Sequence, residues 1–275
     1  MTLPTNHQSS TSFVERRTVR IAIPVVIGLA VIATWEAVVR IKGIEPYLLP
    51  SPSRIAQALV EDRSLLLAAL WVTLKTTMLA LSMAVVGGVG LAVLFSLSRI
   101  LEISLFPYAI VLQVTPLIAI APLINVWLYD QVWLVLLICA WIVAFFPILS
   151  NTVVGLKSVD ENHRDLFRLY GASAWQRLRF LMGPTALPYF FAGLKIAGNL
   201  ALVGAIVAEF AVGAAGEQTG LASTILESGF RLEIPRMFAA LSLISATGIC
   251  IYFVMHGFSQ WILGPWHSSA GKGDQ

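Results

Sequence analysis

The residue best placed for chemistry is an acid inside an apolar run. Glu209 lies near the end of GLKIAGNLALVGAIVAEF, residues 193–210. A charge at the centre of a bilayer costs about 2.5 to 3.5 kcal/mol on insertion scales, so acids inside membrane spans usually have a function. Two interpretations remain open. Glu209 lies near the outer surface and snorkels or pairs with an arginine of residues 231–236, or it lines a gate at the outer end of a pathway. Asn199 lies ten residues earlier, about 280° around an α-helix, and therefore on a different face.

A second group of polar residues interrupts the apolar run of residues 104–128. It contains Gln113, Thr115 and Asn125, together with Pro116 and Pro122. Prolines free backbone carbonyl groups, which lipid does not satisfy but a cavity or a neighbouring helix can. We therefore expect this run to line a pathway through the membrane.

Enzyme and nucleotide motifs are missing from the sequence. The segment GAAGEQTG, residues 213–220, is rich in glycine but lacks the lysine and hydroxyl pair of a phosphate-binding loop, and no strand pattern precedes it. The sequence also contains no GxSxG nucleophile elbow and no HExxH zinc pair. We expect no ATP binding, no catalytic residue, no metal and no cofactor in this chain.

Composition indicates that these residues are carried by a membrane protein. Hydrophobic residues make up 57% of the chain and charged residues 12%, whereas soluble domains carry about 25% charged residues. The mean hydropathy is +0.81. The net charge of +3 comes from short loops and not from a basic patch, which argues against nucleic acid as a partner.

Six runs are long enough to cross a bilayer, so we predict an all-α integral membrane protein with six transmembrane helices. A span needs about 20 mostly apolar residues. The predicted spans are 21–39, 66–97, 104–128, 131–152, 187–212 and 238–263. The membrane domain is predicted at 21–265, between an N-terminal tail of residues 1–20 and a C-terminal tail of residues 266–275.

Lysine and arginine counts predict the orientation. With a cytoplasmic N-terminus, the inner segments hold ten basic residues and the outer segments six. Cytoplasmic loops carry the excess of basic residues, so both termini and the loop of residues 157–184 are predicted on the cytoplasmic side.

That loop contains the polar stretch RDLFRLYGASAWQRLRFLMGPTALP, residues 164–188. Gly171 is a natural C-terminal cap for a first helix. Ser173, with Gln176 three residues on, has the pattern of a capping box that starts a second helix. Gly183 and Pro184 are expected to stop this second helix, so that neither helix spans the membrane. The loop is then an amphipathic hairpin on the membrane surface, or a rigid corner that docks into another protein through Phe167, Tyr170 and Trp175.

The stretch resembles the signature loop of the permease subunits of binding-protein-dependent ABC importers. That pattern is Glu-Ala-Ala, three residues, Gly, nine residues, then Ile-x-Leu-Pro. Here Asp165 stands at the acid, Gly171 at the glycine and Pro184 at the proline, while Leu166 and Phe167 replace the alanines. The segments LLPSP (48–52), VTPLIAIAPLINVWL (114–128), 193–210 and SGFRLEIPRMFAALSLIS (228–245) are similar to the nitrate, taurine, sulfonate and thiamine-precursor branch.

The resemblance implies a type I ABC importer fold in the bacterial inner membrane. It implies a second permease copy, two ATP-binding cassette ATPase subunits and an extracytoplasmic solute-binding protein as partners, with ATP hydrolysed by the ATPases. The resemblance implies that the transported solute is a small organic molecule, and anionic solutes belong to the expected class. The alternatives are a stand-alone secondary transporter or channel-like protein and an intramembrane enzyme. The residues assigned to ATPase coupling are Asp165, Leu166, Phe167, Arg168, Tyr170, Gly171, Ala172, Ser173 and Pro184, and those assigned to the pathway or gate are Gln113, Thr115, Pro116, Asn125, Asn199 and Glu209.

Overall fold

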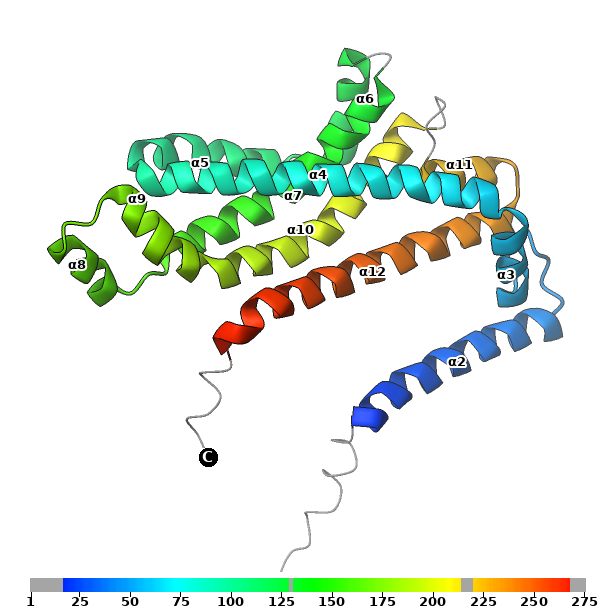
Figure 1. Ribbon diagram of the computed structural model, residues 1–275. Coiled ribbons are helices and arrows are strands. Elements are labelled where there is room, and N and C mark those ends of the chain that lie inside the picture. The colour runs from blue at the N-terminus through cyan, green and yellow to red at the C-terminus, as the bar shows by residue number, and fades with distance from the viewer. Residues whose placement is uncertain (1–16, 129–130, 214–219, 268–275) are drawn as a thin grey trace, which may run out of the picture.

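The computed structural model describes residues 17–128, 131–213 and 220–267, and every regular element within them is a helix (Figure 1). In chain order these are α2 (Arg17–Ile41), α3 (Pro52–Glu61), α4 (Arg63–Leu97), α5 (Arg99–Val114), α6 (Leu117–Trp127), α7 (Val132–Lys157), α8 (Glu161–Leu169), α9 (Ala174–Arg177), the π-helical turn η1 (Leu178–Met182), α10 (Gly183–Val212), α11 (Leu221–Phe230) and α12 (Ile234–His267). The predicted all-α fold is confirmed.

Five continuous helical segments are long and apolar enough to cross a membrane. They are Ala22–Ile41, Arg63–Leu97, Val132–Lys157, Ala174–Val212 and Ile234–Gly264. The pair α5 and α6 counts as a sixth span if the two helices cross together. The predicted tails lie outside the described residues, except for 17–20, which begin α2, and 266–267, which end α12. Most of the glycine-rich segment of residues 213–220 also lies outside them.

The third predicted span, residues 104–128, is not one straight helix. α5 and α6 meet at an angle of 99°. Thr115 has ψ 125° and Pro116 has ψ 111°, so both residues leave the helical conformation. A proline disfavours the helical conformation in the residue before it, and it also lacks the N–H that would continue the helix. Gln113, Thr115 and Pro116 therefore lie at a sharp bend, while Pro122 and Asn125 lie within α6.

The centre of the molecule is α7, which packs against both α4 and α10 (Figure 1). Glycine allows the close approach of α7 and α10. A Cβ atom added at Gly193 would lie 2.6 Å from the Pro147 carbonyl oxygen, and one at Gly204 would lie 2.9 Å from the Ala140 Cα. Small residues at such contacts are the usual way in which membrane helices gain packing energy, because lipid supplies little hydrophobic driving force.

The N-terminal helix α2 lies at the edge of the molecule (Figure 1). Its C-terminal part contacts the rest of the molecule. Glu36 accepts hydrogen bonds from the Ser53 backbone N–H at 3.0 Å and the Ser53 hydroxyl at 2.8 Å. The rings of Trp35 and Phe238 are 6.1 Å apart, which joins α2 to α12. Most of the remaining α2 side chains are exposed.

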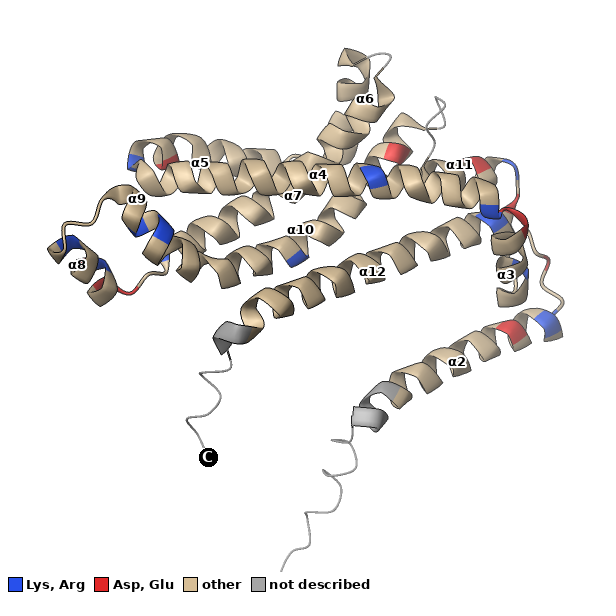
Figure 2. Cartoon of the chain, in the orientation of Figure 1, with Lys and Arg blue, Asp and Glu red and all other residues tan. Residues whose placement is uncertain are grey.

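Charged residues gather at the two ends of the long helices (Figure 2). One group surrounds α8, α9 and the start of α5, and the other surrounds α3, the start of α4 and the start of α12. Between them α4, α7, α10 and α12 are almost free of charge along the described residues. This distribution fits helices that cross a bilayer, with α8 and α9 at one face and α3 and α11 at the other.

Candidate functional site

The first part of the candidate site is the helical corner, which we define as residues 160–176. It begins at Asp160, which accepts a hydrogen bond from the Asn162 backbone N–H at 2.8 Å. This hydrogen bond is the main reason that the pKa of Asp160 lies below its usual value. At the other end of α8, Arg168 stands in the last turn and pairs with Asp165 at 3.2 Å. An acid near the positive N-terminal end of a helix dipole and a cation near its negative C-terminal end both interact favourably with the dipole. These interactions stabilise a helix as short as α8.

Gly171 forms the corner as predicted. Its φ is +65°, and a Cβ atom placed there would have no neighbour within 4 Å. The Gly171 and Ala172 backbone N–H groups donate to the carbonyl oxygens of Arg168 and Phe167, at 3.0 Å and 2.9 Å. These bonds close the end of α8, which glycine allows because it reaches positive φ without steric cost. The requirement at Gly171 is thus conformational, and the space around it is open.

The predicted capping box of the second helix is also present. The Ser173 hydroxyl accepts a hydrogen bond from the Gln176 backbone N–H at 3.2 Å, and the Gln176 side chain accepts one from the Ser173 backbone N–H at 2.8 Å. Two otherwise free amides are satisfied in this way. The direction in which α9 leaves the corner is therefore fixed by local hydrogen bonds.

The prediction that Gly183 and Pro184 stop the second helix is wrong. The helix continues from α9 through η1 into α10, giving one apolar segment over Ala174–Val212. The Gly183 backbone N–H donates to the Leu178 carbonyl oxygen, five residues earlier. A π-turn widens the helix and relieves the clash that a proline ring makes with the carbonyl group of the preceding turn. The corner is consequently attached to a transmembrane helix without a flexible joint.

The corner presents large apolar side chains to its surroundings. Leu169 is 86% exposed, Tyr170 83% and Trp175 63%. A hollow of about 390 Å³ lies beside them, lined by Leu166, Phe167, Tyr170, Ala172, Gln176 and Phe180. Exposed aromatic groups beside a hollow, with arginine close by, are typical of an interface between proteins.

The second part of the candidate site is a buried cluster around Glu209, which is 1% exposed. The Thr73 hydroxyl donates to Glu209 Oε1 at 2.7 Å, and the Ala222 backbone N–H donates to Glu209 Oε2 at 2.8 Å. The Leu221 backbone N–H donates to Thr73 Oγ1 at 2.9 Å. Glu209 on α10 and Thr73 on α4 thus hold the N-terminus of α11. Gly220 leaves room for the carboxylate, because a Cβ atom there would overlap it.

Of the two interpretations of Glu209, the structure does not show the first, in which it snorkels or pairs with an arginine of residues 231–236. Arg231 pairs with Glu227 at 2.6 Å, and Arg236 pairs with Asp62 at 2.7 Å and also with Glu233. The free amides at the start of α11 supply the positive partial charge that compensates the carboxylate instead.

Among the described residues, none of the other residues assigned to the pathway forms a hydrogen bond with Glu209. Gln113, Thr115 and Pro116 lie at the bend between α5 and α6, where Gln113 and Pro116 are exposed. Asn125 lies half-buried near the end of α6. Asn199 lies in the middle of α10, and its side-chain oxygen is buried without a hydrogen-bond partner among the described residues.

Sequence reasoning missed Thr73 and Gly220. Thr73, Thr76 and Thr77 interrupt the apolar run of α4, and all three are 0% exposed. Hydroxyl groups in an apolar span indicate contacts between helices. That signal was available, but it does not identify Glu209 as the partner, because the two residues are 136 positions apart.

Comparison with known proteins places the fold and the site in a family. Residues 84–264 match the family described as binding-protein-dependent transport system inner membrane component, which is well over half of the chain. The chain belongs to this family. The helical corner lies inside the matched residues, and so does Glu209, whereas Thr73 lies before them.

Named relatives agree with this membership. The chain is 32% identical over 244 residues to the formylaminopyrimidine transport permease protein ThiX of Halalkalibacterium halodurans, covering 88% of this chain and 95% of that one. It is 32% identical over 256 residues to the riboflavin transport system permease protein RibX of Chloroflexus aurantiacus, covering 90% and 91%. A solved amino acid ABC transporter chain shares the fold, with a TM-score of 0.60 and 18% identity over 74% of this chain and 97% of that one.

The permease is therefore a multi-pass membrane subunit of an ABC importer for a small solute. It works with an ATPase and a substrate-binding partner, as its family does, and hydrolysis belongs to the ATPase. The alternative of a stand-alone transporter or channel gains no support from these relatives.

Proposed function

We propose that the helical corner docks into an ATPase subunit and passes its movement to the membrane helices. The observation that carries this proposal is the pairing of an exposed apolar corner with a rigid connection into α10. Tyr170 and Leu169 supply the apolar contact, and Arg168 supplies charge beside it. Because α9, η1 and α10 form one segment, a tilt of the corner is transmitted to the core around α7.

The complete importer in this proposal contains two copies of the permease, two ATPase subunits and one extracytoplasmic binding protein. The loop of residues 157–184 and both termini face the cytoplasm, in agreement with the excess of basic residues on that side. Figure 1 supports this arrangement, since the start of α2 and the end of α12 point toward the end of the molecule that carries α8.

The proposed substrate is a small organic solute that contains a nitrogen heterocycle. The support comes from the two relatives above, which are named for formylaminopyrimidine and riboflavin. Uptake of a panel of labelled pyrimidines, flavins and sulfonates into cells with the complete importer tests this class. Uptake of sulfonates alone would contradict it.

At the outer end, we assign Glu209 and Thr73 as positioning residues for α11. The bend at Thr115 and Pro116 lines the pathway in this proposal, together with Gln113 before it and Asn125 in the last turn of α6, and Asn199 faces it from α10. The buried Asn199 side-chain oxygen supports this role, since a buried oxygen without a partner fits a place that water or solute reaches during transport.

The coupling role is tested by replacing Phe167 and Tyr170 together with alanine. Both residues lie outside the core around α7, so the variant should insert normally. We expect the ATPase to be lost on purification and solute uptake to fall at least tenfold, since a central aromatic contact contributes about 2 kcal/mol or more to an interface. Val60→Ala, an exposed position on α3, is the matched control. Full ATPase retention with normal uptake in the double variant would refute the role.

A further inference from the structure

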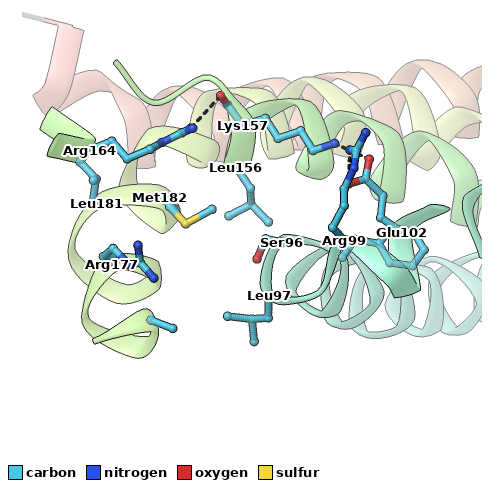
Figure 3. A pocket seen from close by; sticks show the side chains of 12 residues that line it. Ser96, Leu97, Arg99, Glu102, Leu156, Lys157, Arg164, Arg177, Leu181 and Met182 are labelled. Carbon is cyan, nitrogen blue, oxygen red and sulfur yellow. Dashed lines mark hydrogen bonds and ion pairs between the residues drawn. The ribbon is translucent and has the colours of Figure 1, made fainter. Parts of the chain in front are cut away.

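A pocket opens between the helical corner and the adjoining ends of the transmembrane helices (Figure 3). Its volume is about 310 Å³. Arg164 and Arg177 lie on one wall, while Arg99, Glu102 and Lys157 lie on the opposite wall. Apolar side chains also line the pocket, among them those of Leu97, Leu156, Leu181 and Met182.

The pocket carries an excess of positive charge. Four cationic residues line it against one acid, a surplus of three. Glu102 is shared by Arg99, at 2.9 Å, and Lys157. Arg164 donates to the Lys157 backbone carbonyl at 3.5 Å. Arg177 forms no ion pair with any described residue. Cations that converge without enough acids provide a site for an anion.

An apolar groove adjoins this basic pocket. Its volume is about 790 Å³, and it runs between α4 and α10. The two share Leu156, and η1 contributes to both, since Leu178 lines the groove and Leu181 lines the pocket. The groove is lined almost entirely by apolar residues, including Val86, Val89, Val93, Leu187 and Phe190. A headgroup-sized basic pocket and a surface suited to a hydrocarbon chain thus lie next to each other at Leu156.

We propose that the pocket and the groove together bind an anionic phospholipid, with the phosphate group in the pocket and an acyl chain along the groove. Arginine is suited to phosphate because its planar guanidinium donates two parallel hydrogen bonds. Basic pockets between transmembrane helices on the cytoplasmic side bind such headgroups. The shared chemistry is a phosphate ester, and the apolar groove favours a lipid over a soluble phosphate compound.

The bound lipid joins the corner to the membrane domain. Arg164 belongs to α8 and Arg177 to α9, while Arg99 and Lys157 belong to α5 and α7. One phosphate group that contacts both walls would restrain the corner against the ends of the spans. This consequence rests on the proposed coupling function, but lipid binding itself does not.

The binding experiment uses the full chain in nanodiscs of phosphatidylcholine with or without phosphatidylglycerol, followed by native mass spectrometry of retained lipid. We expect retained phosphatidylglycerol, and a loss of roughly fivefold in affinity for Arg177→Gln and for Arg164→Gln, the usual contribution of one basic residue near an anionic surface. Arg168→Gln is the control, because it removes the same charge from α8 outside the pocket. Equal retention in all variants would overturn the proposal, and so would an equal loss in Arg168→Gln.

A second variant distinguishes the source of the phosphate. Val86 is 76% exposed in the groove, so Val86→Trp fills the groove without disturbing the core. We expect this variant to retain less phosphatidylglycerol, and we expect sn-glycerol 3-phosphate not to displace the lipid from the unchanged protein. Displacement by sn-glycerol 3-phosphate would show a soluble ligand and overturn the lipid assignment. Normal lipid retention with loss of the permease dimer would show that a second copy occupies the groove.

Discussion

The buried cluster at the start of α11 makes a measurable prediction for Thr73→Val. Valine has nearly the shape of threonine, so the substitution removes the hydroxyl group and little else. It removes the 2.7 Å hydrogen bond to Glu209 and leaves the Leu221 backbone N–H, 2.9 Å away, without its acceptor. A typical hydrogen bond contributes about 0.5 to 1.5 kcal/mol to stability, and polar contacts between membrane helices average about 0.6 kcal/mol. Because two bonds are lost, we expect a destabilisation of about 1 to 3 kcal/mol.

The assay is thermal unfolding of the purified permease in detergent, as a double-mutant cycle with Glu209→Leu, which removes both acceptor oxygens of the side chain. The two substitutions should be non-additive, because they remove the same hydrogen bond. Thr76→Val is the matched control. The Thr76 hydroxyl is equally buried but has no hydrogen-bond partner in the described part of the chain, so its loss should be neutral or stabilising. Equal destabilisation by Thr73→Val and Thr76→Val, or strict additivity in the cycle, would refute the reasoning.

Three further predictions concern the corner and its orientation. Gly171→Val should misdirect α8 at a cost of about 1 kcal/mol or more, seen as weaker ATPase retention, and Gly171→Asn should cost less because asparagine tolerates positive φ; equal retention in both would contradict a conformational role. A membrane-impermeant maleimide should label Tyr47→Cys in intact cells but Trp175→Cys only after permeabilisation, and the reverse pattern would invert the proposed topology. The pKa of Asp160 is lowered in the folded protein, so its capping of α8 should be complete above about pH 4 and be lost as the pH falls through the lowered pKa. Amide exchange at Asn162 should become faster over this pH range as the cap is lost. In Asp160→Asn, which has no carboxyl group to protonate, amide exchange should show no such loss of the cap.

Local features of the corner could be predicted from the sequence. The capping box at Ser173 and the positive φ at Gly171 depend on residues within three or four positions of each other, so the pattern contains the information. Pro184 misled the same reasoning, because a single π-turn changes the outcome and no residue type announces it. At Pro116 the error was the opposite one. One continuous span was expected over residues 104–128, with the proline inside it, but α5 ends just before Pro116.

The contacts of the buried acid could not be predicted. Glu209 stood out by residue type, but its partners come from α4 and from the start of α11. The choice between an arginine and a helix N-terminus as partner is decided by how α4, α10 and α11 pack. The basic pocket was missed for a related reason, since its walls come from α5, α7, α8 and α9, and each arginine alone has the pattern of an ordinary surface charge.

Site-directed cross-linking between the corner and the ATPase tests the central claim most directly. A cysteine-reactive photo-cross-linker attached to Tyr170→Cys, at a side chain that is 83% exposed, should join the permease to its ATPase subunit in membranes. The same probe on Tyr47→Cys, 57% exposed at the opposite end, should not. We expect the yield from position 170 to change between the nucleotide-free and ATP-bound states, because the corner moves with the ATPase. No product from position 170, or an equal yield from position 47, would contradict the account.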